Sequence, residues 1–190
     1  MRTNRWLVVA LLVIGAVFGA SAIIGSTVVN RYTSTDAFCT SCHTMAFQAD
    51  DPYFQHSVHR SNKEGVRPSC GDCHIPRNNW LVETYTHVSS GAYDAFAEFT
   101  HNFSDPKLWQ ARRSELAQEV HAQMHAQDSV TCRSCHDANA IHPTSDDGQK
   151  AHALLSQGGV TCVDCHTNLV HSPVPPPATQ PAASPTTESK

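Results

Sequence analysis

One pentapeptide, Cys-x-x-Cys-His, occurs four times and uses every cysteine in the chain. In each copy the two cysteines can form thioethers with the vinyl groups of one haem, and the adjacent histidine can then bind the iron. Zinc sites and redox dithiols also use Cys-x-x-Cys, but neither requires a histidine after each second cysteine. The sequence therefore predicts four covalently bound haem c groups. The predicted attachment residues are Cys39, Cys42, Cys70, Cys73, Cys132, Cys135, Cys162 and Cys165, and the motif histidines are His43, His74, His136 and His166.

The spacing of the motifs indicates a duplication. Successive motifs start 31, 62 and 30 residues apart, which gives two pairs. The residue before the second cysteine is serine in the first motif of each pair and aspartate in the second. His59 and His152 occupy the same place, 20 residues after the first cysteine of each pair. We expect a duplicated two-haem module, at about 31–100 and again at 128–171.

Histidines outside the motifs are candidates for the second axial ligand that a low-spin haem iron requires. His59 and His152 are favoured because the repeat selects each of them. His171 follows the last motif by a few residues, just before a proline-rich stretch, and is the third candidate. His56 has no repeat equivalent and is interpreted as a surface residue or a neighbour of a ligand. One haem is thus left without a distal histidine.

The first motif differs from the others because Met45 lies two residues after its histidine. Methionine is a known axial ligand of haem iron, although a single methionine also serves in packing. Met45 can replace His43 on the iron, or His43 can remain. Cys39 lies only ten residues after an apolar N-terminal run, so this unusual haem is expected nearest the membrane.

A helix is predicted over 80–99, because the segment has no proline and a single glycine. Glu83, His87 and Asp94 fall on one of its faces at 3.6 residues per turn. They can form a solvated stripe, or they can accept protons at a site of quinol oxidation. The residues alone favour neither alternative.

A second helix is predicted to begin at Ser104-Asp105-Pro106, which offers an N-cap and a proline for the first turn, and to end near Gln127. It would link the two modules. His121 and His125 lie four residues apart on this helix. That spacing can bind a metal, but a solvated helix face is the favoured interpretation.

The N-terminus carries an uncharged run of 24 residues from Trp6 to Val29, preceded by Arg2 and Arg5. This is long enough for one bilayer-spanning helix, and the arginines favour a cytoplasmic N-terminus. The alternative is a signal peptide cleaved after Ala20-Ser21-Ala22, but the apolar run continues beyond that point. A retained anchor at 1–30 is therefore expected in the bacterial inner membrane, with the rest of the chain in the periplasm. Gly15 and Gly19 make a homodimer possible.

The remaining chain is expected to form a haem domain at 31–171 and a disordered proline-rich tail at 172–190. About 140 residues cannot build a large side-chain core around four haems, so short helices wrapped around the porphyrins are expected. The fold class is thus mainly α, with one transmembrane helix and a small multihaem cytochrome c domain. The formal net charge of −4 argues against a nucleic-acid partner.

These features together resemble the NapC/NirT family of membrane-anchored tetrahaem quinol dehydrogenases, which includes the NrfH-type proteins. The likeness covers about residues 6–171. It is carried by Phe38-Cys-Thr-Ser-Cys-His-Thr-Met45, by His59-Arg-Ser-Asn-Lys-Glu-Gly-Val-Arg67 followed by Cys70-Gly-Asp-Cys-His-Ile-Pro76, and by Glu115-Leu-Ala-Gln118 and Asp128-Ser129.

The resemblance implies roles for single residues. Met45 would belong to the quinol-facing haem, and Asp94, in Gly91-Ala-Tyr-Asp94, would lie on its distal side. His87 and Glu83 stand where lysines are frequent in the family, so this chain departs from the pattern there. His59 and His171 match distal-ligand positions, and His152 matches a NapC-type histidine.

The resemblance also implies a function. The chain would oxidise menaquinol or ubiquinol and pass electrons to a periplasmic reductase or cytochrome in anaerobic respiration, with a nitrate reductase-type partner favoured. It would be an electron-transfer subunit and not a terminal reductase. The alternatives are a multihaem reductase of a small nitrogen or sulfur oxide and a released periplasmic electron shuttle.

Overall fold

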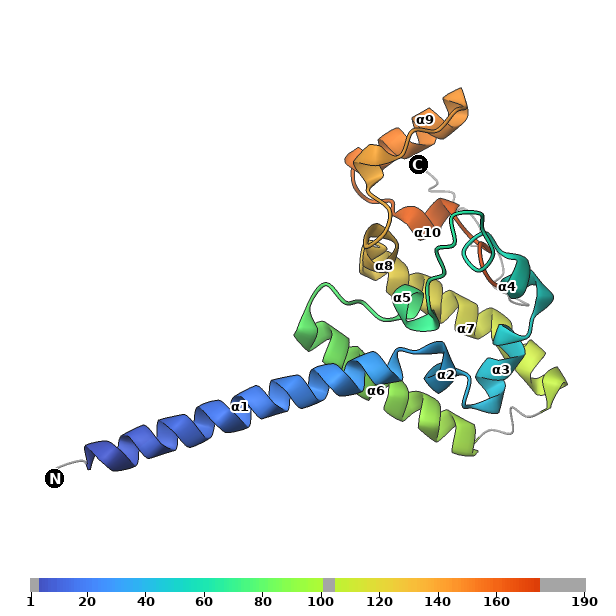
Figure 1. The fold of residues 1–190 in the computed structure, drawn as a ribbon. Helices are drawn as coiled ribbons and strands as arrows, with labels where there is room; N and C mark the ends of the chain where they lie inside the picture. Colours follow the sequence, from blue (N-terminus) through green and yellow to red (C-terminus); the bar gives the residue numbers. More distant parts are fainter. Residues whose placement is uncertain (1–3, 101–104, 175–190) are drawn as a thin grey trace, which may run out of the picture.

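The computed structural model describes residues 4–100 and 105–174, and within these ranges the chain forms helices and loops without a strand (Figure 1). The predicted mainly α class is therefore confirmed. Short 3-10 turns occur at Ala138–Ala140 and Leu154–Ser156. The helices are α1 (Arg5–Thr33), α2 (Asp36–Cys39), α3 (His43–Ala49), α4 (Pro52–His56), α5 (Cys70–His74), α6 (Trp80–Thr100), α7 (Pro106–Ala126), α8 (Val130–Arg133), α9 (Asp146–Ala153) and α10 (Cys162–Cys165).

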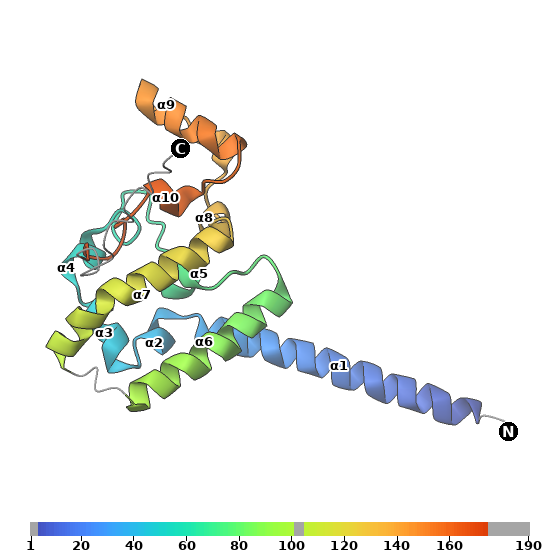
Figure 2. The same ribbon diagram turned by 180° about the vertical axis from the view of Figure 1, so that it is seen from behind.

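Helix α1 extends away from the rest of the molecule in both views (Figures 1 and 2). It runs without a break through Ala20–Ala22, and its apolar side chains are exposed along most of its length. It is the one helix among the described residues that is long and apolar enough to cross a membrane. Arg2, which the orientation argument used, lies outside the described residues, as does most of the predicted tail.

Both other predicted helices are present. Helix α7 begins where its capping sequence indicates: the Asp105 side chain accepts a hydrogen bond from the Lys107 amide (2.8 Å), and Pro106 occupies the first turn. Helix α6 begins with the Asn79 side chain accepting from the Leu81 amide (2.9 Å). Ser104 lies outside the described residues.

The side-chain core is very small. Among the described residues, only Phe54, Trp109 and Val163 are buried large apolar side chains, and Pro76 is also fully buried. A chain of this length normally buries many more. This is the result expected if porphyrin rings and not side chains fill the interior.

The second and fourth motifs share a local structure that explains their aspartates. The Ser69 and Thr161 amides each donate to the aspartate three residues later, Asp72 and Asp164, at 2.7 Å. Each motif helix, α5 and α10, thus starts with a capping box. The aspartate shared by these two motifs is therefore a helix-start signal.

Two unlike residues also occupy equivalent places three positions before the first and third motifs. Asp36 accepts a hydrogen bond from the Cys70 amide (2.8 Å), and Ser129 accepts one from the Val163 amide (3.4 Å). Each side chain thereby joins the start of one motif to the helix of the next. Comparing the two halves of the sequence did not reveal this equivalence, because the acceptor oxygen belongs to an aspartate in one half and to a serine in the other.

Replacing Ser129 by alanine is expected to lower the free energy of unfolding by about 1–3 kcal/mol. Its hydroxyl is fully buried and also accepts from the Thr161 hydroxyl (2.8 Å), so alanine leaves two donors unpaired. Guanidinium unfolding of the haem-loaded protein would measure this. Ser134→Ala is the control, because that exposed hydroxyl contacts only its own turn, the Thr131 carbonyl (2.6 Å) and the Cys135 sulfur (3.8 Å), and its loss is expected to cost under about 0.5 kcal/mol.

Gly71 is expected to tolerate no side chain. A Cβ atom there would lie 2.6 Å from the Ser34 carbonyl oxygen and 2.7 Å from the Ser34 Cβ, both in the turn that follows α1. Gly71→Ala should therefore separate α5 from this turn and destabilise the protein by about 1–3 kcal/mol. Gly25→Ala in α1 meets nothing within 4 Å, so an equal loss of thermal stability in both variants would contradict the packing argument.

Candidate functional site

One continuous cavity of about 2150 Å³ occupies the interior of the domain, and all eight cysteines line it. Pockets for a single small ligand are usually about 300–1000 Å³, so this cavity suits several large groups. All eight cysteines, each within the described residues, are unpaired. The chain thus presents eight thiols to one interior space and uses none in a disulfide.

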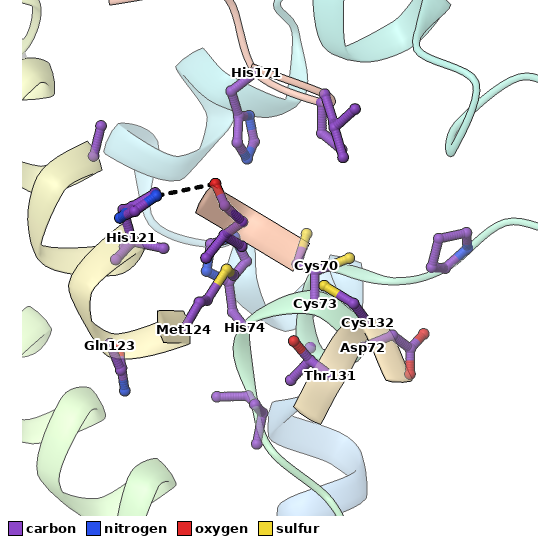
Figure 3. Close-up of a pocket in the computed structure, with 18 of the residues that line it drawn as sticks. Cys70, Asp72, Cys73, His74, His121, Gln123, Met124, Thr131, Cys132 and His171 are labelled. Atoms are coloured by element: carbon purple, nitrogen blue, oxygen red, sulfur yellow. Dashed lines mark hydrogen bonds between the residues drawn. The ribbon is translucent and has the colours of Figure 1, made fainter. Parts of the chain in front are cut away.

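The four motifs follow one another in space in the order of the sequence. The Cys39 and Cys70 thiols interact, which lowers the pKa of Cys39 to about 7 and raises that of Cys70, so the first motif lies beside the second. Burial, followed by the Cys132 thiol of the third motif, raises the pKa of Cys73 to about 11. The closeness of Cys70, Cys73 and Cys132 is visible in Figure 3. Burial, followed by the Cys162 thiol of the fourth motif, likewise raises the pKa of Cys132, so the third and fourth motifs are also close together.

Three motif histidines face a second histidine across this cavity. The ring centroids are 6.2 Å apart for His74 and His171, 6.1 Å for His59 and His136, and 5.9 Å for His152 and His166. Two metal–imidazole bonds of about 2 Å each place the ligating nitrogens about 4 Å apart and the ring centres about 6 Å apart. Each separation therefore suits one iron atom held between two imidazoles.

The states of these histidines also suit metal ligation, which requires a neutral imidazole. Burial lowers the pKa of His74 to about 4, and burial likewise lowers the pKa of His59 and of His171. In His152 the Nδ1 atom lies 2.8 Å from the Gly148 carbonyl, so Nδ1 carries the proton and Nε2 has a free lone pair. The residues present therefore fit haem groups.

The pairing crosses between the two halves of the chain. His152 faces the motif histidine of its own half, whereas its repeat equivalent, His59, faces His136 of the other half. His74 in turn faces His171 from the end of the described chain, as Figure 3 shows. Two of the three pairs therefore join segments 31–100 and 128–171.

The side chain of His43, in the first motif, lies outside the described residues. Met45 and Asp94 line the cavity here. Asp94 interacts electrostatically with Cys39, and burial raises the pKa of its carboxyl group. The Thr44 hydroxyl donates to Glu98, which holds α3, the helix of Met45, against α6.

His87 lies where α6 meets the end of α1. The Thr33 and Ser34 hydroxyls are 3.2 and 3.1 Å from its two ring nitrogens, and burial lowers its pKa. Glu83, one turn earlier, lines a separate cavity of about 460 Å³ together with Thr27, Arg31 and Arg77. The predicted stripe of α6 is therefore divided: His87 and Asp94 face the large cavity, and Glu83 faces the small one.

His121 and His125 contact the fourth motif. His121 Nε2 lies 3.0 Å from the Val163 carbonyl (dashed line in Figure 3), and His125 Nδ1 lies 2.8 Å from the Asp164 carboxylate. Both side chains are about half exposed, as expected for a solvated helix face, and the same face also contacts α10. Their spacing on α7 could not reveal this contact, because α10 lies about 40 residues further along the chain.

A membrane-length helix, four Cys-x-x-Cys-His motifs on one cavity and three facing histidine pairs define a membrane-anchored multihaem c-type cytochrome. The family model for the NapC/NirT cytochrome c family, N-terminal region, matches residues 1–176. The chain therefore belongs to the NapC/NirT cytochrome c family, and its cofactors are four covalently bound haem c groups.

Several relatives show the same relationship. A probable tetraheme cytochrome c-type protein of Nitrosomonas europaea is 35% identical over 167 residues, which are 87% of this chain and 66% of the relative. The cytochrome c-type protein TorC of Escherichia coli K12 is 37% identical over 88% of this chain but 43% of its own length. The cytochrome c-type protein NapC of Haemophilus influenzae is 30% identical, over 90% of this chain and 84% of its own. The chain thus spans less than half of TorC. No solved structure matches it.

Proposed function

We propose that the protein oxidises a membrane quinol at the first haem and passes the electrons through the other three haems to a periplasmic terminal reductase. One observation carries this proposal: the first motif directly follows α1, and the buried carboxyl group of Asp94 lies beside its Cys39. Met45, two residues after the motif histidine, also lines the cavity there. A titratable carboxyl group at the motif next to the membrane anchor suits the oxidation of a lipid-soluble donor of electrons and protons.

The proposed haem ligands follow from the cavity. The eight cysteines provide the thioethers, and haem supplies reversible one-electron chemistry when bound. His74 and His171 would ligate the second iron, His136 and His59 the third, and His166 and His152 the fourth. His43 or Met45 would ligate the first.

Oxidation of a quinol releases two electrons and two protons, so the site needs a proton acceptor as well as an electron path. The Asp94 carboxylate lies beside the first motif, and its raised pKa makes it a better acceptor than an exposed aspartate. His87, at the end of α1, is a second group that can take a proton and pass it to solvent.

The partner proposal rests on the family. A nitrate reductase-type partner in anaerobic respiration is favoured, since the NapC relative is matched over most of its length. The haem domain would lie in the periplasm, with the N-terminus in the cytoplasm. The released-shuttle alternative requires cleavage of α1, and N-terminal sequencing of the mature protein decides it: a start near Ile23 would overturn the quinol proposal.

A quinol analogue added to membranes that contain the full-length protein should reduce the haems, seen as growth of the α-band. If the band does not change while dithionite reduces all four haems, the proposed function is wrong. Turnover of nitrite or hydroxylamine by the isolated protein would instead support the reductase alternative.

A further inference from the structure

Helix α6 has an exposed apolar face that extends along its whole length. Leu81, Tyr85, Val88, Phe96 and Phe99 are between 66 and 90% exposed. At about 100° per residue these five side chains fall within one third of the helix circumference, and Ala92 lies among them. From Leu81 to Phe99 the face is about 27 Å long. Such a continuous apolar stripe on a helix surface marks an interaction site.

The opposite face of α6 carries all its titratable side chains except the two tyrosines. Glu83, His87, Asp94 and Glu98 lie within about 60° of one another on that side. Glu83 lines the small cavity and His87 contacts the end of α1. Asp94 lines the large cavity, and Glu98 accepts a hydrogen bond from Thr44. Helix α6 therefore has the strongly divided faces of a helix that lies in a membrane interface.

The position of α6 continues the surface of the membrane anchor. Asn30 donates from Nδ2 to the Thr84 hydroxyl (2.9 Å), and the Thr33 hydroxyl contacts His87, so the first turns of α6 pack on the last turns of α1. The apolar run of α1 ends at Val29. The early part of α6 thus lies at the depth where the bilayer core ends, and α6 crosses the end of α1 obliquely in both views (Figures 1 and 2).

Other groups at this junction suit the headgroup layer. Tyr32 and Trp80 are at least partly exposed here, as aromatic side chains commonly are at membrane surfaces. Arg31 lines the small cavity between α1 and α6, where its guanidinium group can bind a lipid phosphate, whereas Arg77 in the same cavity is paired with Asp72 (2.5 Å). The apolar run of α1, about 36 Å long, also exceeds a bilayer core of about 30 Å, which favours a tilted α1.

We propose that α6 is a second membrane contact, which lies along the bilayer surface with its apolar face toward the lipid. The occupant of this face is the lipid bilayer and not a second copy of the chain. Because His87 and Asp94 lie on the other side of the same helix, α6 would form the wall between the lipid and the first haem site. This inference does not depend on the electron donor.

Hydroxyl-radical footprinting of the full-length, haem-loaded protein in phospholipid nanodiscs tests the proposal. Two matched pairs serve as internal controls. Tyr85 is 73% exposed and Tyr53, on α4, is 43% exposed. Phe99 is 90% exposed and Phe47, on α3, is 36% exposed. From exposure alone, Tyr85 should be oxidised faster than Tyr53 and Phe99 faster than Phe47. Lipid contact should reverse this, so that Tyr85 and Phe99 are oxidised at least about fivefold more slowly than Tyr53 and Phe47.

Oxidation in proportion to exposure, with Tyr85 faster than Tyr53 and Phe99 faster than Phe47, would overturn the proposal. Discs that hold one chain, sorted by mass, separate lipid from protein as the occupant. Protection that appears in one-chain discs supports the membrane contact. Protection that requires two chains per disc would show a dimer interface and would equally overturn it.

Discussion

Replacing Asp94 by asparagine is expected to slow haem reduction by a quinol analogue by about 100-fold, while dithionite still reduces all four haems. A positioned proton acceptor typically contributes 10²–10⁴-fold to a rate, and asparagine keeps the size of the side chain but cannot accept the proton. Stopped-flow measurement of the α-band in nanodiscs gives the rate. Asp147→Asn makes the same charge change on a fully exposed side chain of α9 and should leave the rate unchanged.

The pH dependence gives an independent test of the same role. Burial raises the pKa of Asp94, and proton acceptance requires its carboxylate form. The wild-type rate should therefore rise as the pH rises through this raised pKa, and the Asp94→Asn variant should lack that rise. If the variant retains both the wild-type rate and the wild-type pH profile, Asp94 is not the proton acceptor.

Replacing His59 by alanine is expected to convert one haem, the third, from six-coordinate low spin to a form that binds carbon monoxide. In the structure His59 faces His136, so its removal opens one position on that iron. Electron paramagnetic resonance of the oxidised protein counts the high-spin haems, and carbon monoxide titration of the reduced protein counts the haems that bind the gas. Each number should rise by one haem per chain. His56→Ala is a close control, because that exposed side chain contacts the Pro52 carbonyl (2.7 Å).

A double variant tests the crossed pairing. His171 faces His74 and His59 faces His136, so His59→Ala with His171→Ala should open two haems. If the two histidines competed for one iron, the double variant would open only one. That result would contradict the ligand assignment even if each single variant behaved as expected.

The features that the sequence predicted well depend on local interactions. Helix α7 could be located because Asp105 and Pro106 are a helix start wherever they occur in the fold. The length of α1 follows from an uninterrupted apolar run. The alternating Ser and Asp of the motifs reflect hydrogen bonds within three residues, and so remain visible in a single sequence.

The features that escaped prediction depend on contacts between distant segments. His59 and His152 have the same offset from a motif, yet the loops that carry them take different paths. The two histidines therefore face motif histidines in different positions of the repeat. Glu83 and His87 share a helix face, but the end of α1 packs against this face. His87 therefore contacts Thr33 of α1, whereas Glu83 lines the small cavity. Asp36 and Ser129 have one role in two chemical forms, which a comparison of residue types cannot detect.

The crossed histidine pairs have a consequence for biosynthesis. A chain is made from its N-terminus, so Cys70 and Cys73 are complete long before His171, near the end of the described chain, has been added. If His171 ligates the second iron, as proposed, an iron attached at the second motif would keep an open position until then, and a product truncated before His171 would retain a reactive haem. With this ligation the second haem would reach its final electronic state only after the segment that contains His171 has been synthesised and has folded onto the second motif.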